Sequence, residues 1–164
     1  MNELVNFLKQ ADIFYQLTPT QLEMIANISY ERTYTTGEII VEEGSASKEL
    51  YIIMQGEAGV FVNPALVGGP ETKKGEVAVS TMRRGQSFGE IALVDEGLRS
   101  ATVRALHKTT RLLVIPRDKL LMLCETYPQL GYRMMYNLAA DLSMKIRNTD
   151  LRIRESLLQG LHNK

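Results

Sequence analysis

The sequence predicts a mainly β protein with flanking helices, arranged as an antiparallel roll or sandwich. Six short β-rich segments follow one another at spacings of roughly eight to twelve residues, and glycines separate most of them. No helical pattern lies between most of these segments, which argues against βαβ units, and helix-patterned stretches stand at both ends of the chain. The longest interruption, residues 64–74, contains Gly68-Gly69-Pro70 and is predicted to be a mobile hairpin loop. The six segments are 38–41, 49–55, 58–63, 76–82, 99–105 and 109–115.

Two helices are expected before the first strand. In the first helix, apolar residues such as Leu4 and Leu8 recur at helical spacing. The second helix has two start signals, because Pro19 suits the first helical position and Thr18 and Gln21 match a capping box. The chain therefore enters its β region from a short helical layer.

Two more helices are expected at the other end. Pro116 ends the strands and suits the first position of a helix that runs to about Tyr127. Pro128 then resets the chain, and one long helix is predicted to run to Gln159. Gly160 is expected to take the left-handed conformation that ends many helices.

The long helix carries an apolar stripe whose second half outruns a domain of this size. Three pairs of its residues stand eleven positions apart, the period of a nearly straight or slightly right-handed helix. Asp141 precedes Lys145, and Asp150 precedes Arg154, by four residues, which supports an exposed opposite face. The pattern favours self-association, and hence a homodimer through this helix, over packing within one monomer. The stripe comprises Met135, Leu138, Leu142, Ile146, Ile153 and Leu157.

Composition argues against several classes of protein. The chain has 164 residues, the length of one domain, and its 19 basic residues balance 19 acidic ones. Charge therefore gives no general attraction to nucleic acid or to a membrane surface. The single cysteine, Cys124, cannot form an intrachain disulfide, and the first residues lack a leader, so a cytoplasmic location is expected.

One stretch, residues 85–105, combines groups that suit an anionic ligand. Gly89 has no Cβ, so an anion can approach its backbone, and the short run after it can form one helical turn whose N–H groups face that anion. Arg99 can lend two parallel donors to phosphate oxygens, and Ser100 adds a hydroxyl. Glu90 is an acceptor only, so sugar hydroxyls are its natural partners. The alternative is a surface ion pair of Glu90 with Arg99 around a turn.

This stretch resembles the phosphate-binding cassette of cyclic-nucleotide-binding domains, the modules of catabolite-activator-type regulators, protein kinase A regulatory subunits and cyclic-nucleotide-gated channels. The family pattern is Phe-Gly-Glu, an aliphatic residue, a small residue and Leu, then a turn and Arg-Ser/Thr-Ala. Residues 88–93 and 99–101 match it in full, and the strand-glycine-strand stretch 51–60 also looks like the family's hairpin. The resemblance implies a jelly-roll-like β-roll with a short phosphate-cassette helix and a long C-terminal helix. It divides one domain, 1–164, into N-terminal helices (1–28), β-roll (29–116) and C-terminal helices (117–164).

The resemblance also implies a role for each cassette residue. Glu90 accepts from the ribose 2′-hydroxyl, and Arg99 pairs with the cyclic phosphate. Val60 and Val79 flank the ribose and base by looser matching. The remaining phosphate contacts come from the backbone amides of Gly89, Ile91 and Ala92 and from Ser100.

The identity of the base depends on weaker signals. In this family the base is often capped from the last helix, and the positions here that face it are expected among Leu142, Lys145, Ile146 and Thr149. Ser100 stands where many cyclic-GMP binders of the family carry threonine, so cyclic AMP is expected rather than cyclic GMP. No other cofactor and no metal is expected, since neither His107 nor His162 has a second ligand at metal spacing.

These observations predict a regulatory module and not an enzyme, because no nucleophile-elbow, metalloprotease or phosphate-loop motif is present. The resemblance implies that the ligand closes the last helix over the pocket, and that this movement reaches an unknown protein effector. Two alternative functions are kept. One is the effector half of a transcription regulator, although with few residues after Gly160 the chain alone is not expected to bind DNA. The other is a structural or oligomerisation protein with a vestigial cassette.

Overall fold

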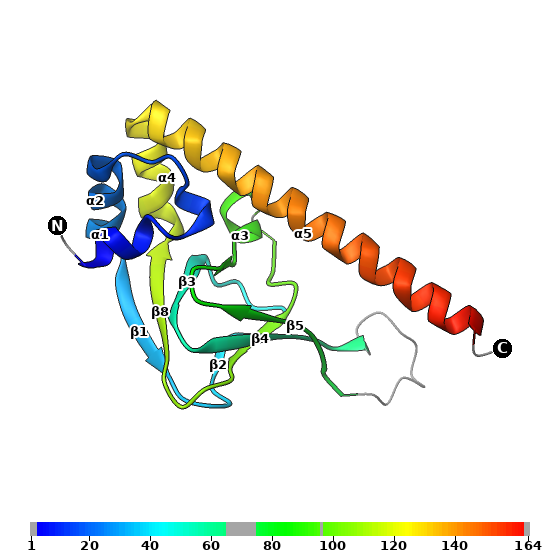
Figure 1. The fold of residues 1–164 in the computed structure, drawn as a ribbon. Coiled ribbons are helices and arrows are strands. Elements are labelled where there is room, and N and C mark those ends of the chain that lie inside the picture. The colour runs from blue at the N-terminus through cyan, green and yellow to red at the C-terminus, as the bar shows by residue number, and fades with distance from the viewer. Residues whose placement is uncertain (1–2, 65–74, 96, 163–164) are drawn as a thin grey trace.

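Two four-stranded antiparallel sheets form the centre of the molecule (Figure 1). The computed structural model describes residues 3–64, 75–95 and 97–162. The first sheet has the strand order β1-β8-β3-β6, and the second has the order β2-β7-β4-β5. The strands are β1 (Tyr30–Tyr34), β2 (Ile39–Val41), β3 (Glu49–Gln55), β4 (Glu57–Val62), β5 (Val77–Arg83), β6 (Ser87–Phe88), β7 (Thr102–Ala105) and β8 (Thr110–Pro116).

The first sheet separates two hydrophobic clusters. Successive side chains of a strand point to opposite faces, so Leu50 and Ile52 of β3 face the helices while Tyr51 and Ile53 face the other sheet. β8 alternates in the same way. Both strands are therefore buried on both faces, which explains why they read as continuous apolar runs.

The second sheet carries one row of small side chains across all four strands. Val103 of β7 is paired with both Val41 of β2 and Val60 of β4, and Val60 is paired in turn with Ser80 of β5. Directly paired residues of antiparallel strands present their side chains on the same face. This row therefore presents its four side chains on one face of the sheet.

The N-terminal helical layer covers the outer face of the first sheet (Figure 1). It consists of α1 (Glu3–Leu8), the 3₁₀ turn η1 (Asp12–Phe14) and α2 (Pro19–Ile28). The capping box at the start of α2 is confirmed: the Gln21 N–H donates to Thr18 Oγ1 at 3.3 Å, and the Thr18 N–H donates to Gln21 Oε1 at 2.9 Å.

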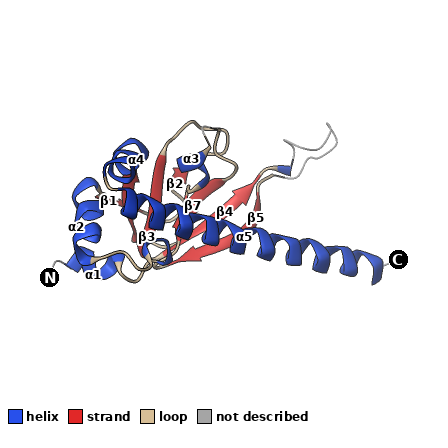
Figure 2. Cartoon of the chain, turned by 90° about the horizontal axis from the view of Figure 1, so that it is seen from above, coloured by secondary structure: helices blue, strands red, loops and turns tan. Residues whose placement is uncertain are grey.

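A short helix, α4 (Arg117–Thr126), and a long one, α5 (Pro128–His162), follow β8. The first turns of α5 pack into the helical layer through Leu130, Met134 and Leu138, which are buried. Beyond Leu138 the helix leaves this layer, runs past the roll and ends well beyond it (Figure 2). Beyond Leu142 the large apolar side chains of this outer half, among them Ile153 and Leu157, are more than half exposed.

The fold class is confirmed, with three corrections at the element ends. Gly160 does not end α5, because it keeps a helical conformation and the helix continues to His162; glycine permits the left-handed conformation without imposing it. Pro116 is the N-cap of α4 rather than its first helical residue. β7 begins three residues later than expected, since the chain from Arg99 is still part of the cassette turn. The predicted loop at 64–74 lies, apart from Pro64, outside the described residues.

Candidate ligand pocket

A cavity of about 450 Å³ lies between the second sheet, the 86–101 segment and α5. The row of paired residues Val41, Val103, Val60 and Ser80 forms its floor. The wall comes from the cassette, and the remaining side comes from one face of α5. The predicted site residues that line it are Gly89, Glu90, Ile91, Ala92, Arg99, Ser100 and Val60.

Val79 is the one predicted site residue that does not line this cavity. It is 40 % exposed, and its neighbour Ser80 is the residue paired with Val60. The register between β4 and β5 shifts here from Val60↔Ser80 to Phe61↔Ala78, so Val79 is the extra residue of a β-bulge and has no direct partner on β4. The structure therefore has Ser80, and not Val79, in the lining of the cavity.

Arg99 is almost fully buried and is held in place by three protein acceptors. Its Nε donates to Ser47 Oγ at 2.8 Å, its Nη2 to the Glu49 carbonyl oxygen at 2.7 Å and its Nη1 to the Gly89 carbonyl oxygen at 3.3 Å. Burial lowers the pKa of Arg99, and nearby acidic groups act in the opposite direction. A guanidinium has five N–H groups, so these bonds leave one on each terminal nitrogen for two oxygens of a ligand.

Gly89 joins β6 to the short helix α3 (Ile91–Val94), and its backbone requires glycine. Its φ is +84°, a conformation that other residues rarely adopt. Within α3 the N–H groups of Leu93 and Asp95 donate to the carbonyls of Glu90 and Ile91. The amides of residues 91 and 92 precede these and have no acceptor within the turn, as at every helix start.

Glu90 is 5 % exposed and contacts the last helix. Its Oε1 accepts from Lys145 Nζ of α5 at 2.7 Å, while its Oε2 is buried without a hydrogen-bond partner among the described residues. The alternative of an exposed ion pair between Glu90 and Arg99 is wrong, because both side chains are buried and each has other partners. A buried carboxylate with an unsatisfied oxygen is the acceptor that a hydroxyl-bearing ligand would need.

The face of α5 that lines the pocket is polar. Of the four positions expected to face the base, Lys145 and Thr149 line the cavity, whereas the half-buried Leu142 and the exposed Ile146 do not. Asn148 and Arg152 also line it, and the sequence reading did not include them. Helical spacing from Lys145, three residues to Asn148 and seven residues to Arg152, was the signal that could have found both.

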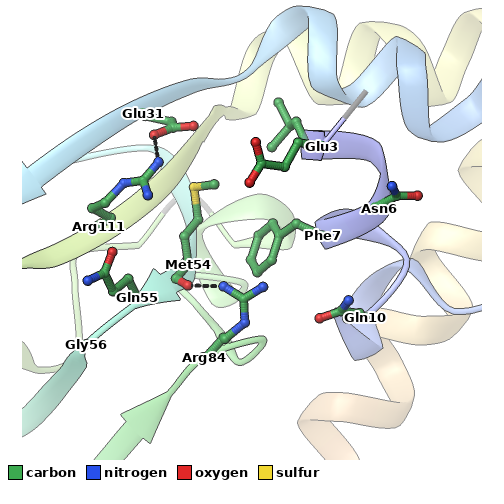
Figure 3. Close-up of a pocket in the computed structure, with 11 residues that line it drawn as sticks. Glu3, Asn6, Phe7, Gln10, Glu31, Met54, Gln55, Gly56, Arg84 and Arg111 are labelled. Carbon is green, nitrogen blue, oxygen red and sulfur yellow. Dashed lines mark hydrogen bonds and ion pairs between the residues drawn. The ribbon is translucent and has the colours of Figure 1, made fainter. Parts of the chain in front are cut away.

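A second, larger cavity of about 690 Å³ lies beside α1, away from the cassette (Figure 3). Its two arginines already have partners: Arg84 donates to the Met54 carbonyl oxygen and lies over the Phe7 ring, and Arg111 pairs with Glu31 at 2.7 Å. No buried unsatisfied group was found among its described lining residues. The smaller cavity is therefore the better candidate.

Two searches over the described part of the chain gave negative results. No helix in residues 3–64, 75–95 and 97–162 is both long and apolar enough to span a bilayer. In the same ranges no three side chains of the metal-binding types come together. The side chain of His162 lies outside the described set.

The sequence of the chain matches a known domain family and is similar to proteins of known function. Residues 31–127 match the family model described as the cyclic nucleotide-binding domain. The chain is 30 % identical over 146 residues to the cyclic AMP receptor protein of Thermus thermophilus, which covers 89 % of this chain and 62 % of that protein. It is 32 % identical over 114 residues to the cAMP-dependent protein kinase regulatory subunit of Schizosaccharomyces pombe, which covers 70 % of this chain and 24 % of that protein.

A solved structure shows the same similarity at the level of the fold. The crystal structure of the Thermus thermophilus catabolite activator protein superposes with a TM-score of 0.72 at 28 % identity, over 88 % of this chain and 62 % of that one. The chain thus spans less than two thirds of the length of each of these relatives.

Proposed function

The chain belongs to the cyclic nucleotide-binding domain family, and from this premise we propose that it is a cyclic AMP sensor whose ligand binding is coupled to movement of α5. One observation carries the proposal: a buried acceptor-only side chain, Glu90, and a buried arginine, Arg99, line one cavity with the start of α3 beside them. A cyclic phosphate has a single negative charge and sits beside ribose hydroxyls. It therefore needs a hydrogen-bond donor for the phosphate and, close to it, a hydrogen-bond acceptor for the hydroxyls.

The proposed contacts follow from the geometry of the wall and the floor. The free N–H groups of Arg99 and the amides at 89–92 would hold the cyclic phosphate, with Ser100 beside it. Glu90 would accept from the 2′-hydroxyl, and the row that contains Val60 would pack against the ribose and base. The protein supplies binding in this proposal and no bond is made or broken, so no catalytic residue and no further cofactor is assigned.

The choice of cyclic AMP over cyclic GMP has two supports. Ser100 stands where many cyclic-GMP binders of the family have threonine. Asn148 lines the cavity from α5, and an amide that both donates and accepts matches the N6 and N7 edge of adenine. The Thermus and yeast relatives named above are also cyclic AMP proteins by name.

A homodimer through α5 is the second part of the proposal. Seven large apolar side chains on its outer half are more than half exposed, and a second copy of the same helix would cover part of them. They are Met144, Ile146, Leu151, Ile153, Leu157, Leu158 and Leu161. A protein effector that reads the movement of α5, a cytoplasmic location and the lack of nucleic-acid binding by this chain stay predictions.

Calorimetric titration with cyclic AMP, cyclic GMP and linear 5′-AMP tests the proposal. We expect cyclic AMP to bind tightest and 5′-AMP weakest, because the linear phosphate carries more charge and a different shape. At one hundred times its dissociation constant a ligand adds about 2.7 kcal/mol of stability, which a thermal shift detects. The rival, a vestigial cassette on a structural protein, predicts neither heat nor shift with any of the three at millimolar concentration.

A further inference from the structure

The outer half of α5, which extends past the roll in Figure 2, carries two separate rows of exposed apolar side chains. Lys145 and Arg152 mark the side that faces the roll, because both donate to carbonyl oxygens there. At about 100° of rotation per residue, the two rows lie on opposite flanks of the helix, each about 80–140° away from Lys145. The first row comprises Ile146, Ile153 and Leu157, and the second, which we call the outer row, comprises Met144, Leu151 and Leu158.

One partner helix cannot cover both rows. Two packed helices meet along a narrow seam, and rows on opposite flanks of one helix fall into two different seams. The first row belongs to the eleven-residue pattern that predicts self-association, so a homodimer formed along it leaves the outer row uncovered. Rows of exposed apolar side chains of this kind mark interaction surfaces, and the outer row is therefore a surface for a different occupant.

The outer row has the spacing of a coiled-coil seam. Its residues stand seven positions apart, and a second set with the same spacing follows them by three positions. Together the two sets occupy the first and fourth positions of three consecutive heptads, where a partner helix packs. The seam covers about 26 Å of helix axis. The first positions are Met144, Leu151 and Leu158, and the fourth positions are Arg147, Arg154 and Leu161.

The two arginines in this seam disfavour a second copy of the chain as the occupant. Parallel pairing in register would place Arg147 and Arg154 opposite their own counterparts, so that like charges meet. Antiparallel pairing would place Arg154 against Leu151, with no acidic residue in the seam to neutralise it. Neither arginine forms an ion pair within residues 3–64, 75–95 and 97–162. Carboxylates on a facing helix would pair with both guanidinium groups.

We propose that the outer row of α5 docks an acidic amphipathic helix of a partner protein, with apolar residues at heptad spacing and carboxylates that face Arg147 and Arg154. A helix is favoured over an anionic lipid surface, because the carboxylate of Glu155 lies only about 40° around the helix from Leu151 and would be repelled by anionic lipid. The inference goes beyond the proposed function, since it requires neither a bound nucleotide nor a movement of α5.

Fluorescence anisotropy with a labelled synthetic peptide tests the surface on the full chain. The probe has three heptads with Leu at the first and fourth positions and Glu at the fifth and seventh, and a matched probe has Lys in place of Glu. We expect the Glu peptide to bind the wild type at least about tenfold more tightly than the Lys peptide does. Arg147→Glu combined with Arg154→Glu should reverse this preference, which a merely apolar contact would not produce.

A matched pair of variants locates the contact on the helix. Leu151→Asp, in the outer row, should weaken binding of the Glu peptide at least about tenfold. Ile153→Asp, in the first row, makes the same kind of change on the opposite flank and should keep the affinity within about threefold of the wild type. Both side chains are exposed, so both variants should keep the thermal transition of the wild type.

Three results would overturn the proposal. The first is equal affinity of the wild type for the Glu and Lys peptides, or no binding of either. The second is a sedimentation-velocity result in which Leu151→Asp, and not Ile153→Asp, dissociates the chain, because the outer row would then be the self-association surface. The third is cosedimentation with phosphatidylglycerol vesicles that Leu151→Asp abolishes, which would assign the row to a membrane. None of these measurements contains cyclic AMP, so the sensor function is tested separately.

Discussion

A Cβ atom added to Gly89 would lie 2.6 Å from Nη1 of Arg99 and 2.7 Å from the Glu49 carbonyl oxygen. Real Cβ atoms do not approach other atoms so closely, and both neighbours are held by hydrogen bonds. The backbone at Gly89 and the guanidinium of Arg99 therefore fix each other's positions, and a change at either one reaches the proposed phosphate site.

Gly89→Ala should lose both stability and nucleotide binding. Its positive φ and the clash with Arg99 together are expected to cost about 2–4 kcal/mol in urea unfolding. Gly37→Ala is the matched control, because Gly37 has a φ of +88° but nothing within 4 Å of an added Cβ. It should cost only the backbone strain, about 1 kcal/mol, and keep its affinity for cyclic AMP. Equal losses in the two variants would show that the clash is unimportant.

Arg99→Lys should weaken the binding of cyclic AMP by about ten- to hundredfold in calorimetry. A lysine cannot give two parallel donors to the phosphate and also keep the bonds to Ser47 and Glu49. Arg111→Lys, at an exposed ion pair on β8, is the control and should change neither affinity nor stability. An unchanged affinity in Arg99→Lys would remove Arg99 from the binding mechanism.

Val60→Phe should block the pocket, whereas Val79→Phe should not. Val60 belongs to the floor of the cavity, so a phenyl ring there would occupy the space of the ribose and base and reduce affinity at least about tenfold. Val79 lies at the β-bulge of the next strand, is exposed and does not line the cavity, and β-strands accept phenylalanine well. Titration of both variants with cyclic AMP compares them directly. A larger loss in Val79→Phe would place Val79 in the site and contradict the cavity lining described above.

Asn137→Ala should destabilise the fold by about 1–3 kcal/mol in urea unfolding, because it leaves two carbonyl groups without a donor. Asn137 is 6 % exposed, and its Nδ2 donates to the carbonyl oxygens of Ile13 at 3.0 Å and Tyr15 at 2.9 Å. Ser143→Ala removes an exposed hydroxyl farther along α5 and should stay within about 0.5 kcal/mol of the wild type. If Asn137→Ala lowered the free energy of unfolding no more than this control does, the hydrogen bonds of Asn137 to the η1 region would contribute nothing to stability.

The sequence predicted the local features well, because local rules determine them. The ends of β3 agree to the residue, and the capping box at Thr18 forms as expected. The cassette also follows the expected order of glycine, short helix, turn and arginine. Six of the eight strands among the described residues were predicted from short β-rich runs cut by glycine.

The two missed strands lack the pattern on which the prediction relied. β1 consists of polar and aromatic residues that are almost all exposed, so it shows no alternation of buried and exposed positions. β6 has only two residues. The β1 pairing with β8 brings together segments about eighty residues apart, which no local signal reports.

The parts of the site that the sequence did not reveal are set by contacts across the fold. The bonds from Arg99 to Ser47 and Glu49 and the bond from Lys145 to Glu90 join residues about fifty positions apart. The position of Val79 depends on a β-bulge between β4 and β5, which strand pairing reveals and periodicity does not. Asn148 and Arg152 line the pocket because of the direction in which α5 crosses the roll, and no local signal reports that direction.

The burial of β3 and β8 on both faces has a consequence for how the molecule unfolds. Each strand contributes alternate side chains to the helical layer and to the space between the sheets. If the helices alone unfolded, Leu50, Ile52 and Leu113 would become exposed to water while their neighbours stayed packed. The free energy of unfolding of a small domain is only a few kcal/mol, which cannot sustain such a half-exposed sheet. The helices and the sheets should thus unfold cooperatively, as one thermal transition rather than two.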